Sequence, residues 1–386
     1  MKALTTVIIL ACAVAACQGK NVPANSSAAS SAAPPAASES RATLPQLSYA
    51  DVIERVGPGV VTIRAARRVR APRQGPFGDD PLFRQFFGDI FPPGRSQPPS
   101  VQLALGSGVI VRRDGTILTN FHVIDGAEQI KVELTNHSVL DAKVAGSDAA
   151  SDLAVLKING KDLDALSLGD SDRVRVGDIA LAIGNPLGVG QKVTAGIISA
   201  KGRATGLSDG TFEDFLQTDA PINQGNSGGA LINTKGELIG INSQILSTSG
   251  GSIGIGFAIP SNMARNVMDQ LLQTGKVRRG QLGIAIQPMT PELAENFGLS
   301  QGRGVLVNQV TPNGPAAHAG IRQGDVIVAF DGKAVEDGNS LRNRVASTAP
   351  GTKATLTIIR DKREERIAVT LGEYQPQQAR NQRAPE

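Results

Sequence analysis

Short apolar runs alternate with turn residues through the middle of the chain, from about residue 60 to residue 260. The clearest runs are Val60–Ile63, Gly106–Val111, Gly115–Asn120, Ile130–Leu134, Val139–Ala145 and Leu153–Ile158. Glycines and polar residues separate them, and residues 230–241 again read as strand, turn, strand. Strand segments this short and this closely spaced are typical of an all-β barrel or sandwich. The pattern therefore predicts a mainly β fold.

Two stretches show helical periodicity instead. Residues 48–56 predict a short amphipathic helix that leads into the first strand. Residues 264–275 predict a second amphipathic helix, which begins after a cap formed by residues 261–263 and ends at Gly275.

Length and composition limit the function classes. A chain of 386 residues is too long for one ordinary core and predicts two domains with tails. The net charge of +4 is modest, and the arginines between residues 64 and 73 have no interleaved aromatic residues, so nucleic-acid binding is not expected. The sequence has no Gly-Lys-Ser/Thr motif, so we expect no use of ATP. It also has no His/Asp/Glu cluster with metal-ligand spacing, and we expect no metal or other cofactor.

The amino terminus has the pattern of an export signal. A short basic start is followed by an apolar run, and both cysteines of the chain, Cys12 and Cys17, lie in the first 17 residues. Residues 14–17 resemble a bacterial lipobox, in which Cys17 would be acylated and become the mature amino terminus. Residues 13–15 instead offer an A-x-A cleavage site, and both interpretations stay open. Residues 18–45 are rich in Ser, Ala and Pro, which predicts a disordered tether.

A Pro-, Gly- and Arg-rich stretch interrupts the strand pattern at residues 67–100. It contains five of the eleven phenylalanines, at positions 77, 83, 86, 87 and 91. A solvent-exposed linker would leave these apolar rings in water. The loop is therefore expected either to dock on another subunit as a regulatory element or to pack on its own domain.

The candidate nucleophile is Ser227. It lies in the segment Gly225-Asn226-Ser227-Gly228-Gly229, where flanking glycines permit a sharp turn and a close approach of substrate. The backbone amides of the loop from Gly225 through Asn226 to Ser227 form the candidate oxyanion hole. The pattern also fits the nucleophile elbow of α/β-hydrolases, but that fold requires a helix after the serine and a downstream histidine in the same domain.

The general base is therefore sought upstream of Ser227. His122 follows a predicted strand, and Asp152 directly precedes another, where a carboxylate can orient an imidazole. Asp141 and Asp148 are nearby alternatives for that role. The order His122, Asp152, Ser227 on a β-rich chain is that of chymotrypsin-type serine proteases.

Four motifs together resemble the HtrA/Deg family of trypsin-fold serine endopeptidases. They are residues 119–123 (TNFHV), 152–157 (DLAVLK), 225–229 (GNSGG) and 254–260 (GIGFAIP). Beyond them, Gly304–Val307, Gly314–Ile321 and Gly324–Ile327 resemble a PDZ domain with a groove helix over 339–347 and a closing hairpin over 354–371. Pro221 departs from the family, which more often has Ala there.

The resemblance implies a chymotrypsin-like double β-barrel followed by a small α+β PDZ domain. The domains would be a signal peptide with lipobox (1–17), the tether (18–45), the protease (46–263), a linker helix (264–279), the PDZ domain (280–373) and a polar tail (374–386). It also places Ile222, Ile245 and Leu246 around the specificity pocket, and Gln281, Leu282, Gly283 and Ile284 in the peptide-binding loop.

The same resemblance implies a partner set and a location. Substrates would be unfolded polypeptides, C-terminal peptides would bind the PDZ domain, and the protein would form a homotrimer or a higher multiple in the periplasm or cell envelope. The alternative function is a chaperone or peptide-binding scaffold with weak or no proteolysis.

Overall fold

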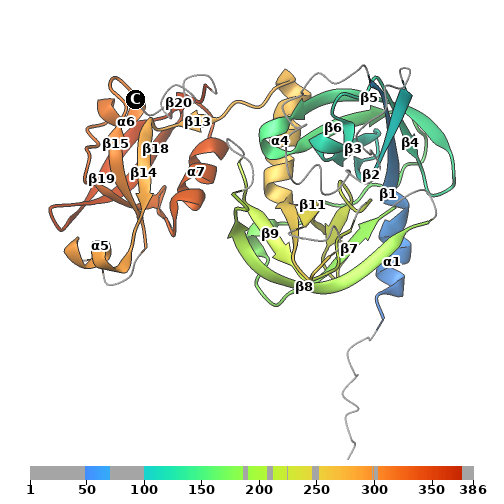
Figure 1. Cartoon of the computed structure of the whole chain (residues 1–386), viewed down its shortest axis with the longest axis horizontal. Helices are drawn as coiled ribbons and strands as arrows, with labels where there is room; N and C mark the ends of the chain where they lie inside the picture. Colours follow the sequence, from blue (N-terminus) through green and yellow to red (C-terminus); the bar gives the residue numbers. More distant parts are fainter. Residues whose placement is uncertain are drawn as a thin grey trace, which may run out of the picture. The chain divides into compact units, whose positions relative to one another are not determined.

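The computed structural model of the chain describes residues 48–69, 100–185, 190–206, 212–223, 225–245, 252–297, 299 and 303–375. These residues form two closed β-barrels followed by a smaller domain of strands and short helices (Figure 1), and the predicted mainly β fold is confirmed. The predicted signal peptide, the tether and the phenylalanines of the 67–100 loop lie outside the described residues. Within the described ranges, no helix has both the length and the apolarity needed to cross a membrane.

The first barrel closes in the strand order β1-β2-β3-β6-β5-β4. Its strands are β1 (Val60–Val69), β2 (Ser100–Arg112), β3 (Thr116–Thr119), β4 (Gln129–Glu133), β5 (Val139–Asp148) and β6 (Leu153–Ile158). The helix α1 (Ala50–Val56) and a 3-10 turn, η1 (Gly57–Gly59), precede it. Its interior is filled by fully buried β-branched and leucine side chains, including Ile63, Ile117 and Leu156.

Strands β1 and β2 are longer than the sequence predicts. β1 continues through the arginines to Val69, and it pairs antiparallel with β2 along its whole length, from Val60 opposite Val109 to Val69 opposite Ser100. The predicted 67–100 loop is therefore wrong at both edges, because ladder pairing with a partner strand overrides the local Arg-rich composition.

The second barrel closes in the order β10-β11-β12-β9-β8-β7. Its strands are β7 (Ile179–Gly184), β8 (Lys192–Arg203), β9 (Phe215–Thr218), β10 (Ala230–Ile232), β11 (Leu238–Ile245) and β12 (Gly256–Pro260). The strand, turn, strand prediction after Ser227 is confirmed by β10 and β11. The pairing of β11 with β12 is irregular between Asn242 and Gln244, which places Ser243 at a bulge.

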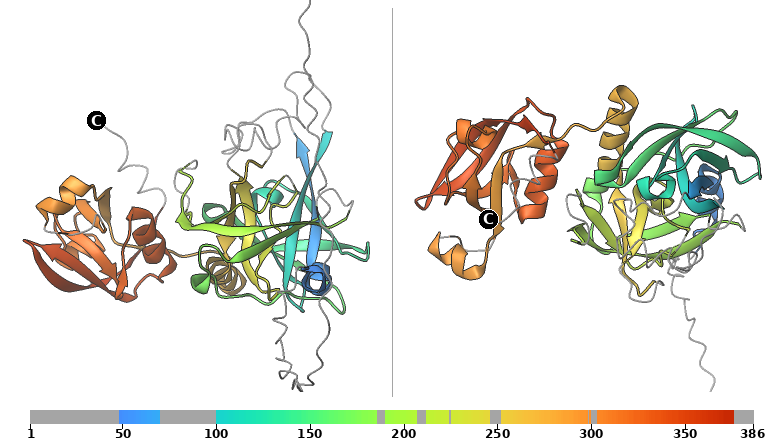
Figure 2. Two further views of the ribbon diagram at one scale, coloured as in Figure 1. Left: turned by 90° about the horizontal axis from the view of Figure 1, so that it is seen from below. Right: turned by 45° about the horizontal axis from the view of Figure 1, so that its top comes forward.

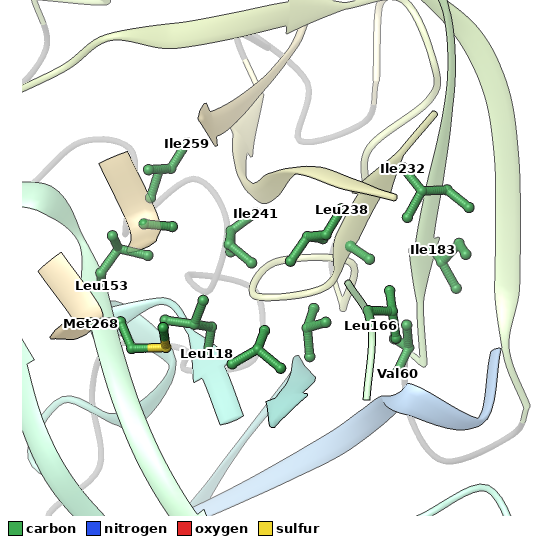
Figure 3. Close-up of a cluster of buried hydrophobic side chains, with 14 of the residues drawn as sticks. Val60, Leu118, Leu153, Leu166, Ile183, Ile232, Leu238, Ile241, Ile259 and Met268 are labelled. Atoms are coloured by element: carbon green, nitrogen blue, oxygen red, sulfur yellow. The ribbon is translucent and has the colours of Figure 1, made fainter. Parts of the chain in front are cut away.

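One buried apolar cluster joins the two barrels (Figure 3). Val60, Leu118 and Leu153 enter it from the first barrel, and Ile183 and Ile241 from the second. Full burial of one such side chain contributes about 1.5–3 kcal/mol. The cluster therefore fixes the relative placement of the barrels, and with it the placement of any site between them.

The helix α4 (Ser261–Thr274) packs its buried side, which includes Met268, on the same cluster. It ends as predicted at Gly275, which has a left-handed conformation with φ of 72°. The predicted cap over residues 261–263 is wrong, because α4 already includes these residues. Pro260 is the N-cap residue, and the Ser261 hydroxyl instead donates to the carbonyl oxygen of Gly169 at 2.9 Å.

The smaller domain has its own core and a sheet in the order β14-β15-β16-β18-β19, with β14 at an edge. The sheet strands are β14 (Ile284–Pro288), β15 (Val305–Val310), β16 (Val326–Phe330), β18 (Lys353–Arg360) and β19 (Arg363–Thr370), and β17 (Lys333–Ala334) pairs with β16. The helices are α5 (Pro291–Asn296), α6 (Pro315–His318) and α7 (Gly338–Ser347), and β13 (Gly280–Gln281) pairs with β20 (Gly372–Glu373). Helix α7 and the β18–β19 hairpin cover the residues predicted for the groove helix and the closing hairpin. Figure 2 shows this domain, in orange and red, from two further sides.

Candidate active site

His122 is placed by a short helix that the sequence pattern did not predict. After β3 the chain turns through Asn120 into α3 (Phe121–Ile124), which presents the imidazole at the junction of the barrels. The Asn120 side-chain amide donates to the Asp152 carbonyl oxygen at 3.0 Å, and the Phe121 amide donates to the same oxygen at 3.1 Å. Two hydrogen bonds to one carbonyl oxygen thus tie together the segments that carry His122 and Asp152.

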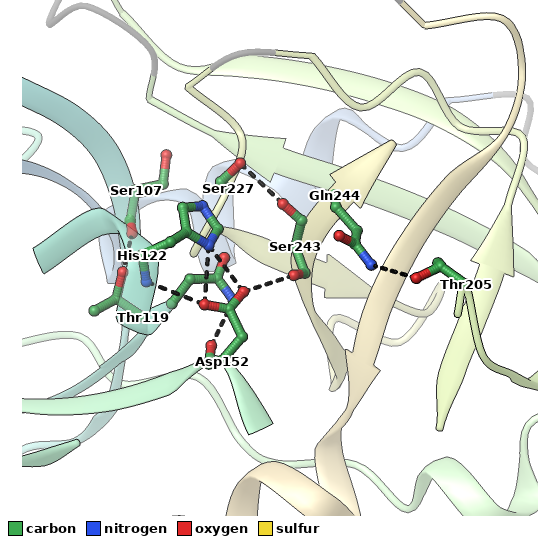
Figure 4. Close-up of polar contacts among 9 residues, drawn as sticks. Ser107, Thr119, His122, Asp152, Thr205, Ser227, Ser243 and Gln244 are labelled. Carbon is green, nitrogen blue, oxygen red and sulfur yellow. Dashed lines mark hydrogen bonds and ion pairs between the residues drawn. The ribbon is translucent and has the colours of Figure 1, made fainter. Parts of the chain in front are cut away.

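The Asp152 carboxylate binds His122 in the arrangement that a triad requires (Figure 4). Nδ1 of His122 lies 2.9 Å from Oδ1 and 2.8 Å from Oδ2 of Asp152, and the His122 backbone amide donates to Oδ1 at 3.0 Å. Because an ionised carboxylate only accepts hydrogen bonds, the proton of the neutral imidazole lies on Nδ1. Nε2 is therefore left with a lone pair that can take up a proton.

Asp152 holds this position in an uncommon backbone conformation. Its φ is 53° and its ψ is 40°, the left-handed region, directly after the 3-10 turn η3 (Ala149–Ser151). A non-glycine residue stays there only where its surroundings fix it, and the two hydrogen bonds to its carbonyl oxygen do so.

The two alternative aspartates have other partners. Asp141 is exposed and pairs with Lys131, whose Nζ lies 3.1 Å from Oδ1. Asp148 accepts from the Ser151 amide at 3.0 Å and forms a two-pronged ion pair with Arg279. Asp152 is therefore the aspartate that the structure brings to His122.

Ser243 joins the catalytic carboxylate to the nucleophile. Its hydroxyl donates to Oδ2 of Asp152 at 2.9 Å, and its carbonyl oxygen accepts from the Ser227 hydroxyl at 3.0 Å. Figure 4 shows the imidazole of His122 with one edge on Asp152 and the other turned to the side from which Ser227 projects. Sequence reasoning missed Ser243, because its partner Asp152 lies 91 residues away and no local motif marks it.

The loop before β10 carries the three amides predicted for the oxyanion hole, and two of them stay candidates. Gly225 has a φ of 93°, and the carbonyl of Asn226 is held by the Gly229 amide at 2.9 Å, which turns the amide of Ser227 the opposite way. The amide of Asn226 donates to the Asn223 carbonyl oxygen at 3.0 Å. Because that amide is already bonded within the loop, Asn226 leaves the candidate set, and Gly225 and Ser227 remain.

The predicted specificity pocket is described only in part. Ile222 is buried beside Gly256, where an added Cβ would lie 2.9 Å from its Cδ1. Ile245 ends β11, but its side chain and Leu246 lie outside the described residues. These three positions stay a prediction.

The predicted peptide-binding loop leads directly into the edge strand of the smaller domain. Gln281 belongs to β13, Leu282 is buried, Gly283 has a φ of 73° and Ile284 begins β14. The carbonyl of Leu282 accepts from the Ala316 amide at 2.9 Å, which anchors the loop to α6. An edge strand of this kind can pair with an added extended peptide.

Comparisons with known proteins agree with this arrangement. Residues 106–241 match the trypsin-like peptidase domain and residues 280–371 match the PDZ domain. The periplasmic pH-dependent serine endoprotease DegQ of Escherichia coli (strain K12) is 45% identical over 333 residues, which cover 85% of this chain and 70% of that protein. A probable periplasmic serine protease do/HhoA-like of Haemophilus influenzae is 44% identical over 343 residues, 86% of this chain and 74% of that protein.

A solved structure shows the same likeness in three dimensions. The HtrA-type protease AlgW with a bound decapeptide has a TM-score of 0.65 and 45% identity, and the match covers 86% of this chain and all of that one.

Proposed function

Since the chain belongs to the HtrA family of trypsin-like serine endoproteases, we propose that it cleaves unfolded or damaged polypeptides with His122, Asp152 and Ser227 as its catalytic triad. The observation that carries the assignment is Ser243, which bonds the Asp152 carboxylate with its side chain and the Ser227 hydroxyl with its backbone. That residue brings the nucleophile and the His122–Asp152 pair, which come from different barrels, to one place.

The reaction begins with a rotation of the nucleophile. The Ser227 hydroxyl turns from the Ser243 carbonyl to Nε2 of His122, which accepts its proton as Oγ attacks the substrate carbonyl carbon. His122 then passes the proton to the leaving amine, the peptide C–N bond breaks, and an acyl-enzyme remains. Water, activated by the same imidazole, releases the acyl group and restores Ser227. Asp152 stays ionised and stabilises the imidazolium in both halves.

The amides of Gly225 and Ser227 bind the oxyanion in this proposal. Charge develops on the substrate oxygen in the transition state, and two fixed donors stabilise it by an amount worth about 3–4 kcal/mol per donor. Gly225 and Ser227 are both buried, and donors that are fixed before substrate arrives need no reorganisation at the moment of reaction.

The substrate class and location follow the relatives. Both curated relatives named above are described as periplasmic serine proteases, and an export signal at the amino terminus of this chain supports a place in the periplasm or cell envelope. A lipid on Cys17 would anchor the protein to a membrane, and A-x-A cleavage would leave it unanchored. The alternative function, a scaffold without proteolysis, has no support in these relatives.

The PDZ domain binds extended peptides by strand addition to β14. Support comes from the edge position of β14, the Gln281–Ile284 loop before it and the peptide-bound AlgW structure. The protease works as a homotrimer or a higher multiple in this proposal, as the family resemblance implies.

The decisive experiment compares the wild type with Ser227→Ala. The wild type should cleave casein and react with a fluorophosphonate probe without added ATP or metal, and the variant should do neither while keeping the wild-type circular dichroism spectrum. Cleavage of casein by purified Ser227→Ala would remove Ser227 from the mechanism.

A further inference from the structure

Ser107, in β2 of the first barrel, uses every polar group it has in hydrogen bonds to the segments around it. It is fully buried. Its hydroxyl donates to the Gly225 carbonyl oxygen at 2.6 Å and accepts from the Asn185 amide at 2.9 Å. Its amide donates to the Ser227 carbonyl oxygen at 2.8 Å, and its carbonyl oxygen accepts from the Thr119 hydroxyl at 2.7 Å.

The two carbonyls that Ser107 holds belong to the two residues whose amides form the proposed oxyanion hole. Glycine has the widest choice of backbone conformations, and the φ of 93° at Gly225 lies where side-chain-bearing residues are rarely found. Because the peptide unit is planar, a bond to the Gly225 carbonyl also fixes the Gly225–Asn226 peptide plane. The Ser107 hydroxyl therefore removes a rotation that the glycine would otherwise allow.

Close packing holds the nucleophile loop against the same strand. A Cβ added to Gly228 would lie 2.2 Å from the Ser107 carbonyl oxygen and 2.3 Å from the Thr119 hydroxyl. A Cβ added to Gly229 would lie 3.2 Å from the Ser107 Cβ. Thr119 ends β3, three residues before His122, so Ser107 is bonded both to the segment that leads to the base and to the nucleophile (Figure 4 shows Ser107 beside Thr119).

We infer that Ser107 is a positioning residue that fixes the oxyanion hole through the carbonyls of Gly225 and Ser227. The inference rests on the triad and the oxyanion donors proposed above. Ser107 does not touch the reacting atoms in this view. Its two bonds hold the Gly225–Asn226 and Ser227–Gly228 peptide units, which flank the unit that carries the Ser227 amide, and so they limit where that amide points. Its loss should therefore weaken binding of the transition state more than binding of the substrate.

The test compares Ser107→Ala with Ser261→Ala in the full-length protein. Ser261 is the matched control, because it is also fully buried and its hydroxyl also donates to a backbone carbonyl, that of Gly169, outside the active site. Three quantities are measured: kcat and KM on a fluorogenic peptide, the Ki of a peptide aldehyde that forms a tetrahedral oxyanion with the serine, and Tm.

Both variants should lower Tm, since each leaves a buried acceptor without its donor. Only Ser107→Ala should lower kcat, by about 10-fold to 100-fold, which is less than the outright loss of an oxyanion donor. KM should stay near the wild-type value, and the aldehyde should bind more weakly by a factor similar to the loss in kcat/KM. Ser261→Ala should keep the wild-type kcat and Ki.

A wild-type kcat and Ki in folded Ser107→Ala would overturn the inference, and so would equal losses in both variants. If Ser107→Ala does not fold, Thr119→Val replaces it. That variant keeps the side-chain shape but removes the hydroxyl on the Ser107 carbonyl, and it should lower kcat at constant KM. An unchanged kcat there overturns the inference too. Activity in Ser227→Ala would instead refute the proposed triad, whereas an inactive Ser227→Ala with a fully active Ser107→Ala refutes only the role of Ser107.

Discussion

Two aspartates four residues apart should give opposite phenotypes when each is changed to asparagine. Asp152 has the His122 imidazole, the His122 amide and the Ser243 hydroxyl as partners. Asp148 has Ser151 and the Arg279 guanidinium. The partners of Asp152 take part in catalysis, whereas those of Asp148 stabilise the fold. Substitution of Asp152 should therefore reduce turnover, and substitution of Asp148 should reduce stability.

Asp152→Asn should reduce kcat by up to roughly 10⁴-fold, which corresponds to about 5 kcal/mol of transition-state stabilisation. The asparagine amide can present an N–H to Nδ1, which favours the tautomer with its proton on Nε2 and removes the base that Ser227 needs. Stability should change little, because Asp152 is partly exposed and the backbone bonds that hold its carbonyl remain.

Asp148→Asn should instead lower the free energy of unfolding by about 3–5 kcal/mol, the usual cost of breaking a buried ion pair from one side. The side chains of Asp148 and Arg279 are only 11% and 8% exposed, so the guanidinium would lose its counter-charge away from water. Folded Asp148→Asn should keep a kcat within a few-fold of the wild type, since the bonds between Asp152 and His122 remain intact.

The assay measures kcat on a fluorogenic peptide, corrected by active-site titration, together with urea unfolding of each variant. Titration separates slow enzyme from unfolded enzyme, so the two effects cannot be confused. If Asp148→Asn lost turnover while Asp152→Asn kept it, the carboxylate that orients His122 would be Asp148 and the arrangement described above would not be the working one.

Four further outcomes follow from the structure and the sequence. Burial raises the pKa of Asp214, so ionisation of this carboxyl lowers the stability of the fold as pH rises above the ordinary pKa of 3.8. Asp214→Asn should therefore have a higher Tm than the wild type near neutral pH, and the difference in Tm should vanish near pH 4. Equal Tm values at every pH would contradict this prediction. Saturating peptides that end in Val or Phe should raise cleavage of a model substrate by about 5–150-fold, and binding without activation would make the PDZ domain a tether only. Deletion of residues 73–97 should raise basal activity or change the oligomer size in gel filtration, and the absence of both changes would favour local packing. Cys17→Ser should move the protein from the membrane fraction to the soluble fraction, and a wild type that is already soluble would support cleavage at the A-x-A site.

Prediction from the sequence is most accurate where the neighbouring residues in the chain determine a residue's structure or role. β6 begins and ends at the predicted residues, because a buried apolar run is bounded by a turn on each side. The flanking glycines predicted Ser227 as the nucleophile, and its hydroxyl is bonded to Ser243, which also binds Asp152. The register of the barrels also brought His122 and Asp152 together, as their chain order predicted.

Prediction from the sequence is less accurate where contacts between residues far apart in the chain determine the structure. Four-residue α3 is too short for helical periodicity to register. Strand β1 continues past Arg64 because β2 and β4 flank it with hydrogen bonds, and no residue within the segment signals that pairing. Ser107 sits between two glycines, a local signal similar to that of Ser227, and both serines are buried. Only the structure shows that the Ser107 hydroxyl donates to the Gly225 carbonyl oxygen and the Ser227 hydroxyl to the Ser243 carbonyl oxygen.

The active site depends on two serines that cross the barrel junction in opposite directions. Ser107 extends from β2 of the first barrel to the loop that carries Ser227, and Ser243 extends from β11 of the second barrel to Asp152 of the first. Neither barrel alone contains a complete set of catalytic contacts, because each supplies the residue that positions the other's functional group. The apolar cluster that joins the barrels is therefore part of the catalytic geometry. Side chains such as Leu118 and Ile241, which touch no reacting atom, hold the two crossing serines at hydrogen-bonding distance from their partners.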